Sequence, residues 1–200
     1  PPRSTSTTAP PIPTAVQKTR AETAPTDDPA PTAGSDDWWS QASQLYDQQN
    51  WAALQAHADK WTQAQPRRDL AWWYLGVARY RQGDYPGTVA AAQQAIAISP
   101  RYVKARWLLS DGYMGTLQWH KSLDILNELL REQPNDAGLW NDIGIDQANL
   151  GEYDDSIAAL EKAVQLDPGY RQAWVNLAQS YASFGNMDRA KAALAKANTL

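Results

Sequence analysis

Beyond residue 34, apolar residues recur at helical spacing within a repeating length of 34 residues. In each repeat, positions 4, 7, 8 and 11 form one stripe of mostly apolar or small residues, and positions 20, 24 and 27 form a second. Spacings of three and four residues place side chains on one face of an α-helix. Each repeat therefore predicts two amphipathic helices of about 13 residues, joined by a turn.

Prolines mark the same period. Pro66, Pro100, Pro134 and Pro168 are spaced 34 residues apart, and each stops a second helix before the next repeat begins. A period of this length is typical of stacked helix–turn–helix repeats. The predicted fold class is all-α, an α-solenoid of about five repeats. They cover 35–68, 69–102, 103–136, 137–170 and a shortened 171–200.

The ten tryptophans fall on only four phases of the repeat. Those at position 4 are predicted to pack between helices, as are those at position 17, whereas position 5 carries a third group. Position 4 holds Trp38, Trp72, Trp140 and Trp174; position 5 holds Trp39, Trp73 and Trp107; position 17 holds Trp51 and Trp119; position 27 holds Trp61.

The turn between the two helices is predicted at position 15. Gly83, Gly151 and Gly185 stand there, and glycine readily adopts the left-handed backbone that ends a helix. Leu117 replaces glycine in the third repeat, so we expect that turn to close differently.

These residues resemble the tetratricopeptide repeat, whose pattern includes Trp, Leu-Gly, Tyr, Ala and a final Pro at fixed positions. The fourth repeat carries most of them: Trp140, Ile143, Gly144, Tyr153, Leu160, Ala163 and Pro168. The resemblance covers residues 35–200 and implies a right-handed superhelix with the first helix of each repeat lining the concave side. It also implies that positions 2, 5, 9, 12 and 13 face this concave groove.

The resemblance thus indicates a ligand-binding groove that is rich in aromatic residues. The alternative is that the rings at position 5 fill a narrow superhelix by touching one another. The predicted groove residues are Trp39, Trp73, Val77, Tyr80, Arg81, Trp107, Asp111, Met114, Asn141, Asp142 and Ile145.

Charge is distributed unevenly over the repeats. Residues 137–170 hold seven acidic residues against Lys162 alone. We expect the C-terminal half of the groove to prefer basic ligand groups, whereas the aromatic half favours apolar ones. The alternative for the acidic residues of the second helix is a solvated surface.

Composition excludes several function classes. The formal net charge of −4 does not favour nucleic acid as a partner. The sequence contains no run of about 18 apolar residues, so direct membrane insertion is not expected. The chain has no cysteine, and His57 and His120 stand alone, so we expect no metal, no cofactor and no catalytic site.

Residues 1–34 differ from the rest. They hold eight prolines among Thr, Ala, Ser and Asp, so they are predicted to be a disordered linker that tethers the repeats to something upstream. This tether and the absence of cysteine favour, weakly, a bacterial extracytoplasmic protein.

The sequence therefore predicts a non-enzymatic scaffold that binds a protein or peptide segment. Two alternatives stay open. The Ala-rich C-terminal end at 185–200 could pair with a second copy to give a homodimer or fibre, or the repeats could be the regulatory or targeting domain of a larger enzyme.

Overall fold

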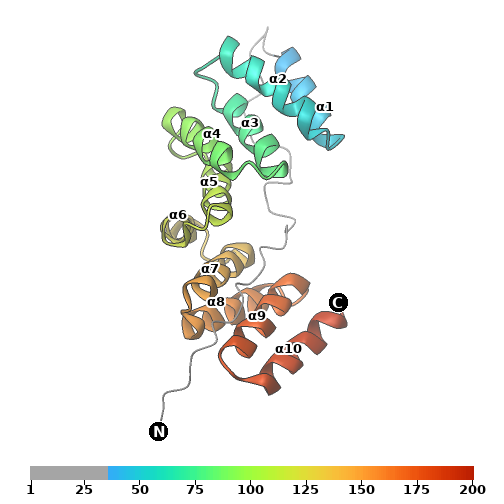
Figure 1. Cartoon of the computed structure of the whole chain (residues 1–200), viewed down its shortest axis with the longest axis vertical. Helices are drawn as coiled ribbons and strands as arrows, with labels where there is room; N and C mark the ends of the chain where they lie inside the picture. The colour runs from blue at the N-terminus through green and yellow to red at the C-terminus, as the bar shows by residue number, and fades with distance from the viewer. Residues whose placement is uncertain (1–35) are drawn as a thin grey trace. The chain divides into compact units, whose positions relative to one another are not determined.

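The computed structural model describes residues 36–200, which form ten α-helices and no strand (Figure 1). The all-α fold of paired helices predicted from the sequence is confirmed. The linker predicted at residues 1–34 lies outside the described residues.

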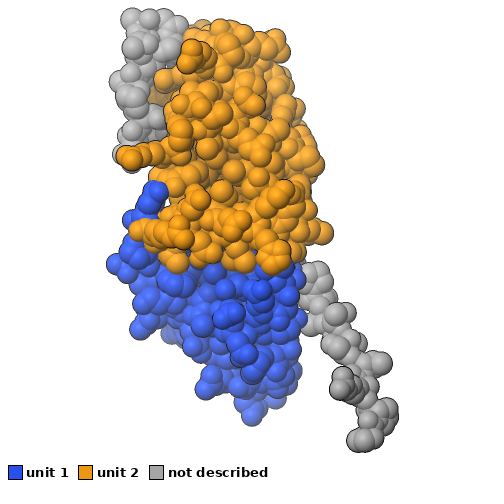
Figure 2. Space-filling view, turned by 90° about the vertical axis from the view of Figure 1, so that its left-hand side faces the viewer, with its two compact units in different colours: residues 1–17, 132–200 blue, residues 18–131 orange. Residues whose placement is uncertain are grey.

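Contacts divide the described residues into two compact units (Figure 2). The N-terminal unit covers 36–131 and the C-terminal unit covers 132–200, and each is described by itself. The N-terminal unit holds α1 (Asp36–Asp47), α2 (Trp51–Ala64), α3 (Asp69–Arg81), α4 (Tyr85–Ile98), α5 (Val103–Gly115) and most of α6 (Trp119–Glu132). The C-terminal unit holds α7 (Ala137–Leu150), α8 (Tyr153–Leu166), α9 (Arg171–Ser183) and α10 (Met187–Asn198).

Small residues let the two helices of a pair approach closely. A Cβ atom added to Gly144 of α7 would lie 2.6 Å from Cγ of Leu160 on α8, which leaves no room for a side chain. At the same crossing, the Ser156 hydroxyl donates a hydrogen bond of 2.7 Å to the Gly144 carbonyl oxygen. The glycine at position 8 and the small hydroxyl at position 20 therefore act together.

The turn at position 15 has a left-handed backbone in all five repeats. The φ angles are 54° at Gln49, 78° at Gly83, 59° at Leu117, 82° at Gly151 and 93° at Gly185. The expectation that the Leu117 turn closes differently is therefore wrong.

Backbone hydrogen bonds explain why leucine adopts the conformation of glycine. The amide of Gln118 donates to the Tyr113 carbonyl oxygen at 2.8 Å, as the amide of Asp84 donates to that of Arg79 at 2.9 Å. These bonds satisfy carbonyl groups at the end of the first helix, and they hold the turn despite the steric cost to leucine.

Polar side chains begin several of the second helices. Asn50, Asp84 and Asn186 each accept a hydrogen bond from the backbone amide three residues later, at 3.3, 2.9 and 3.2 Å. Side-chain caps of this kind satisfy amides that have no partner within the helix.

A tryptophan at position 4 links each of three repeats to the proline before it. The indole N–H groups of Trp72, Trp140 and Trp174 donate to the carbonyl oxygens of Pro66, Pro134 and Pro168, at 2.9, 2.9 and 3.0 Å. The structural role predicted for these three side chains is confirmed. The bond ties the start of one helix pair to the end of the previous one.

The first repeat departs from the pattern by filling its core with larger residues. Leu54 and Trp61 stand where the other repeats mostly have small residues, and both are fully buried. The Trp61 ring stacks on Trp38, with centroids 6.5 Å apart.

We predict that Leu117→Gly stabilises the protein by about 0.5–1 kcal/mol. A left-handed backbone costs a non-glycine residue about 1–2 kcal/mol, and glycine avoids this cost. Part of the stabilisation is offset because glycine loses more chain entropy on folding. Urea unfolding followed by circular dichroism measures the change. Leu117→Ala is the control, since it removes the side chain but keeps the strained backbone. A Leu117→Gly variant less stable than Leu117→Ala would contradict this explanation.

We also predict that Trp140→Phe lowers the free energy of unfolding by about 1 kcal/mol more than Trp119→Phe does. Of these two rings, only that of Trp140 donates to a proline carbonyl oxygen. Both changes remove the same indole group from a half-buried side chain, so the difference isolates the hydrogen bond. Equal losses of unfolding free energy for the two variants would show that the bond adds nothing.

Candidate functional site

The first helices of the N-terminal unit carry the aromatic residues predicted to line a groove. Trp39 on α1 is half-buried, Trp73 on α3 is fully buried, and Trp107 on α5 is 7% exposed. Three side chains at one phase of the repeat therefore differ in exposure.

Trp73 packs tightly against its neighbours. Its ring centroid lies 4.9 Å from that of Tyr74 and 6.1 Å from that of Tyr46, and Lys104 Nζ lies 5.9 Å from it. Aromatic packing, which the sequence left as the alternative role, is thus present at Trp73. Contact with a ligand stays a prediction.

Two other predicted groove residues of α3 are partly accessible. Tyr80 is half-buried, and its ring meets that of Tyr85 edge to face at 5.8 Å. The Arg81 guanidinium lies over the Trp51 ring, 5.1 Å from its centroid. Trp39, Tyr80 and Arg81 are therefore the predicted residues of the N-terminal unit that solvent reaches most easily.

The remaining predicted residues of the N-terminal unit are buried. Val77 is 1% exposed, Asp111 5% and Met114 7%. Gly76, one residue before Val77, shows how closely this region is packed, since a Cβ there would lie 2.7 Å from Leu108 Cδ2.

In the C-terminal unit, the predicted residues belong to a polar network on α7 and α9. Gln172 Nε2 donates to Asn176 Oδ1 at 3.1 Å, and Asn176 Nδ2 donates to Asn141 Oδ1 at 2.8 Å. Asn141 Nδ2 in turn donates to Asp142 Oδ1 at 3.0 Å. The network connects the first helices of two successive repeats.

Sequence reasoning found only part of this network. Asn141 and Asp142 were predicted, together with Ile145, which is buried. Asn176 and Gln172 were not predicted. Asn176 lies 35 residues after Asn141, so it stands one position later in its repeat than Asn141 does in its own. A search for amide residues at adjacent phases would have found the pair.

Three amide side chains of this unit have unused acceptors: Gln147 at position 11, and two others that stand at predicted groove positions. Asn149 Oδ1 on α7 and Gln179 Oε1 on α9 are buried, and neither accepts a hydrogen bond from the described residues. They stand at positions 13 and 9, which are groove positions by the resemblance. We define the amide site as Asn149 and Gln179.

The histidines have ordinary structural environments. His57 Nε2 lies 2.8 Å from the Trp38 carbonyl oxygen, and its ring lies 5.1 Å from that of Trp38. His120 is exposed on α6. Within residues 36–200, the acidic and histidine side chains form no cluster of three that could hold a metal ion.

A search of the described helices for a membrane-crossing segment found none with the necessary length and apolar character.

Comparison with known proteins supports the repeat pattern. Two models described as tetratricopeptide repeat match residues 40–103 and 149–198, which together are more than half of the chain. The peroxisomal targeting signal receptor of Saccharomyces cerevisiae is 37% identical over 65 residues, which are 32% of this chain and 11% of the receptor. Protein FlbA of Caulobacter vibrioides is 22% identical over 192 residues, covering 76% of this chain and 31% of FlbA. The chain thus spans a third or less of each of these relatives.

Solved structures show the same fold. A structure of MamA from Desulfovibrio magneticus RS-1 has a TM-score of 0.77 at 16% identity, covering 84% of this chain and 96% of MamA. A thermophilic protein with such repeats from Thermus thermophilus has a TM-score of 0.67 at 24% identity, covering 83% and 91%. From the matching models and the repeated packing residues, the chain belongs to the tetratricopeptide repeat family.

Proposed function

We propose that the chain is a non-enzymatic scaffold that binds a peptide segment of a partner protein along its first helices. The fold is of the protein-interaction type rather than a catalytic one, and function within such folds depends on the exposed side chains. The name of the yeast relative, a receptor for a targeting signal, supports a peptide as the ligand.

The amide site is the observation that carries this proposal. A buried carbonyl oxygen without a donor costs free energy, and Asn149 and Gln179 each hold one at a groove position. Main-chain N–H groups of a bound peptide are donors of the right kind. A bound peptide that donates to these two oxygens would then remove this cost.

Acidic residues on the same helix favour a ligand with basic groups. Asp142 and Asp146 on α7 are 7% and 0% exposed, so their carboxylates are shielded from bulk water. A lysine or arginine of the ligand would gain more there than on an exposed surface.

Partly accessible aromatic rings supply a second kind of contact. Trp39 on α1 and Tyr80 on α3 are half-buried, and aromatic residues commonly anchor interfaces. The proposed ligand therefore combines apolar side chains with basic ones.

We expect a random peptide library displayed against the full chain to yield sequences that join apolar and basic residues. Asn149→Ala and Gln179→Ala should each weaken the selected peptide about tenfold, the equivalent of one hydrogen bond of about 1.4 kcal/mol. Fluorescence anisotropy of the labelled peptide measures this loss.

Gln94→Ala is the matched control, since Gln94 is an exposed amide on the second helix α4. It should leave the affinity unchanged. If Gln94→Ala weakened the peptide as much as the two amide-site variants, the proposed site would be wrong.

One observation favours self-association as a second candidate function. At position 24, Ala58, Ala92, Leu126 and Leu160 are fully buried, whereas Leu194 is 46% exposed. Leu160 belongs to the same apolar cluster as Leu177 of the following helix, α9. A second copy that covered Leu194 would bury it in the same way.

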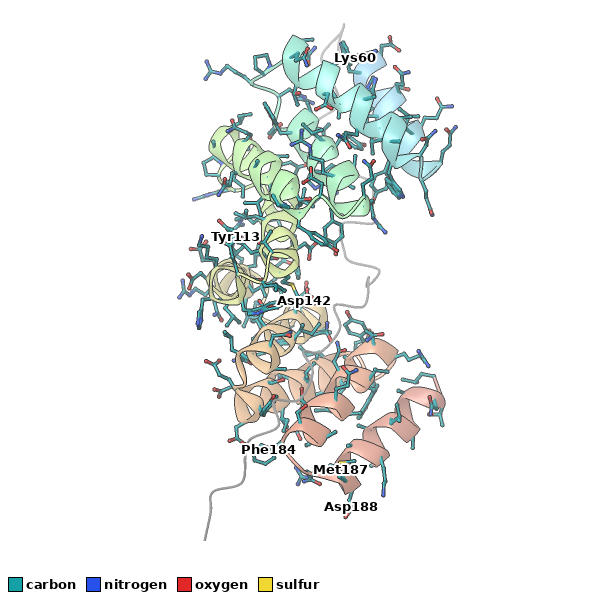
Figure 3. All side chains as sticks on the ribbon, in the orientation of Figure 1. Lys60, Tyr113, Asp142, Phe184, Met187 and Asp188 are labelled. Atoms are coloured by element: carbon teal, nitrogen blue, oxygen red, sulfur yellow. The ribbon has the colours of Figure 1, made fainter. Side chains whose placement is uncertain are left out.

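More apolar surface lies nearby in the C-terminal unit. Phe184 and Met187, at the turn between α9 and α10, are 52% and 54% exposed (Figure 3). Burying such surface is the main driving force for association.

If the chain self-associates, light scattering should show a mass that rises with concentration, and Leu194→Glu should abolish the rise because a charge would be buried. Leu117→Glu is the control, as it also places a charge at an exposed leucine but in the N-terminal unit. A monomeric mass at all concentrations would remove this second candidate.

A further inference from the structure

A cleft lies on the side of α9 where α8 and α10 flank it. Its volume is about 580 Å³, and its lining belongs entirely to the C-terminal unit. We call it the α8–α10 cleft. It is distinct from the amide site, because Asn149 and Gln179 are not among the residues that line it.

The inner surface of the cleft is apolar. Val164 of α8, Trp174 and Leu177 of α9, and Ala192 and Ala193 of α10 form it. Leu177 and Ala193 are 2% and 4% exposed, so they form a fixed floor, whereas Ala192 is exposed at the edge. The floor offers contacts to an apolar group of a ligand.

At the equivalent place in the N-terminal unit, an arginine side chain spans the two second helices. Arg79 of α3 stands at the phase of Tyr181 in α9. Its guanidinium lies 3.5 Å from the Asp59 carboxylate of α2 and 3.9 Å from the Asp84 carboxylate, which precedes α4. Arg79 also donates a hydrogen bond of 3.4 Å to the Gly87 carbonyl oxygen. The side chain thus reaches from α2 to the start of α4.

In the C-terminal unit, Tyr181 stands at this position instead. Its hydroxyl donates a hydrogen bond to the Glu161 carboxylate of α8, which stands at the phase of Asp59. Burial first, and then the neighbouring carboxylate, raise the pKa of Tyr181, so its hydroxyl stays a donor near neutral pH. The ring is therefore held against one wall of the cleft.

The small residues of α10 that line the cleft have equivalents in the N-terminal unit. Ala90 and Ala91 of α4 stand at the phases of Ala192 and Ala193, so both helix pairs share them. Position 11 differs between the two places, as do the positions of Val164, Arg189 and Lys196, where the N-terminal unit has Thr62, Gly87 and Gln94.

The rim of the cleft carries more positive than negative charge. Glu161 is already engaged by Tyr181 and lies 4.0 Å from Arg189, whose guanidinium also covers the Tyr181 ring at 5.6 Å. Lys196 lines the cleft from the last turn of α10 and is exposed. The positive charge of Lys196 favours a carboxylate as its partner.

We propose that the α8–α10 cleft docks a helical segment of a partner protein that presents apolar side chains next to a carboxylate. The cleft is open and flanked by two helices, which suits a helix laid into a groove better than an enclosed small molecule. The apolar side chains occupy the floor formed by Val164, Leu177 and Ala193. The carboxylate pairs with Lys196.

The test uses the full chain and a synthetic amphipathic helix of about 15 residues, long enough to populate the helix. The labelled probe has leucines at helical spacing with glutamates beside them. A second peptide replaces glutamate with lysine, and a third replaces leucine with serine. Fluorescence anisotropy should show saturable binding of the first peptide alone.

Two variants test the location. Ala192→Phe fills the cleft and should weaken the glutamate peptide at least tenfold, whereas Ala195→Phe, also at an exposed alanine of α10 but outside the cleft lining, should not. Lys196→Glu should weaken it more than Lys191→Glu, which changes a lysine that does not line the cleft. Circular dichroism of each variant verifies that the helices are intact.

No saturable binding up to about 1 mM, the weak limit of useful affinity, would overturn the proposal. Equal binding of the lysine peptide, or equal effects of Ala192→Phe and Ala195→Phe, would overturn it as well. Asn149→Ala should leave this binding unchanged, so loss of the amide site and loss of the cleft are distinguishable.

Discussion

A hydrogen bond from a tryptophan indole to a proline carbonyl oxygen fixes the first helix of three repeats to the proline that precedes it. It joins Trp72 to Pro66, Trp140 to Pro134 and Trp174 to Pro168, always across six residues. Proline ends one second helix, and the indole fixes the next first helix to the carbonyl group of that proline. In these three repeats the proline supplies the acceptor and the tryptophan the donor, whereas Arg106 follows Pro100 in the third repeat.

Close approach within a pair is the second constraint. Glycine at position 8 and a small hydroxyl residue at position 20 let the helices meet, and the Ser156 hydroxyl bonds to the Gly144 carbonyl oxygen. Ser156 Oγ also lies 2.8 Å from Ser180 Oγ of α9, so the same hydroxyl connects a pair to the next first helix. Local packing and repeat-to-repeat stacking therefore share atoms.

The sequence predicts the helix pairs well, because the packing residues recur at fixed phases. It fails at Leu117, where backbone hydrogen bonds hold a leucine in a conformation that glycine adopts more easily. Residue identity at one position gives only a preference, and the bonds of the surrounding turn override it. The direction of a side chain is thus easier to predict than the strain that a site tolerates.

The candidate sites are harder to predict, since exposure depends on neighbours that belong to other repeats. Trp39 and Trp73 stand at one phase, yet Trp73 is fully buried beside Tyr46 and Tyr74. Likewise, the amide site is defined by acceptors left unused, and the α8–α10 cleft by side chains that come from three helices. Such features appear only when the atoms around a residue are known.

The link between tryptophan and proline has a consequence for how such chains evolve. A stretch excised or copied between equivalent phases, for example from Trp140 up to Trp174, carries one complete donor and one complete acceptor. The junction left behind would again bring an indole next to a proline carbonyl. Duplication or loss of a 34-residue stretch that begins and ends at such tryptophans therefore preserves this bond, whereas an insertion between the proline and the tryptophan separates donor from acceptor.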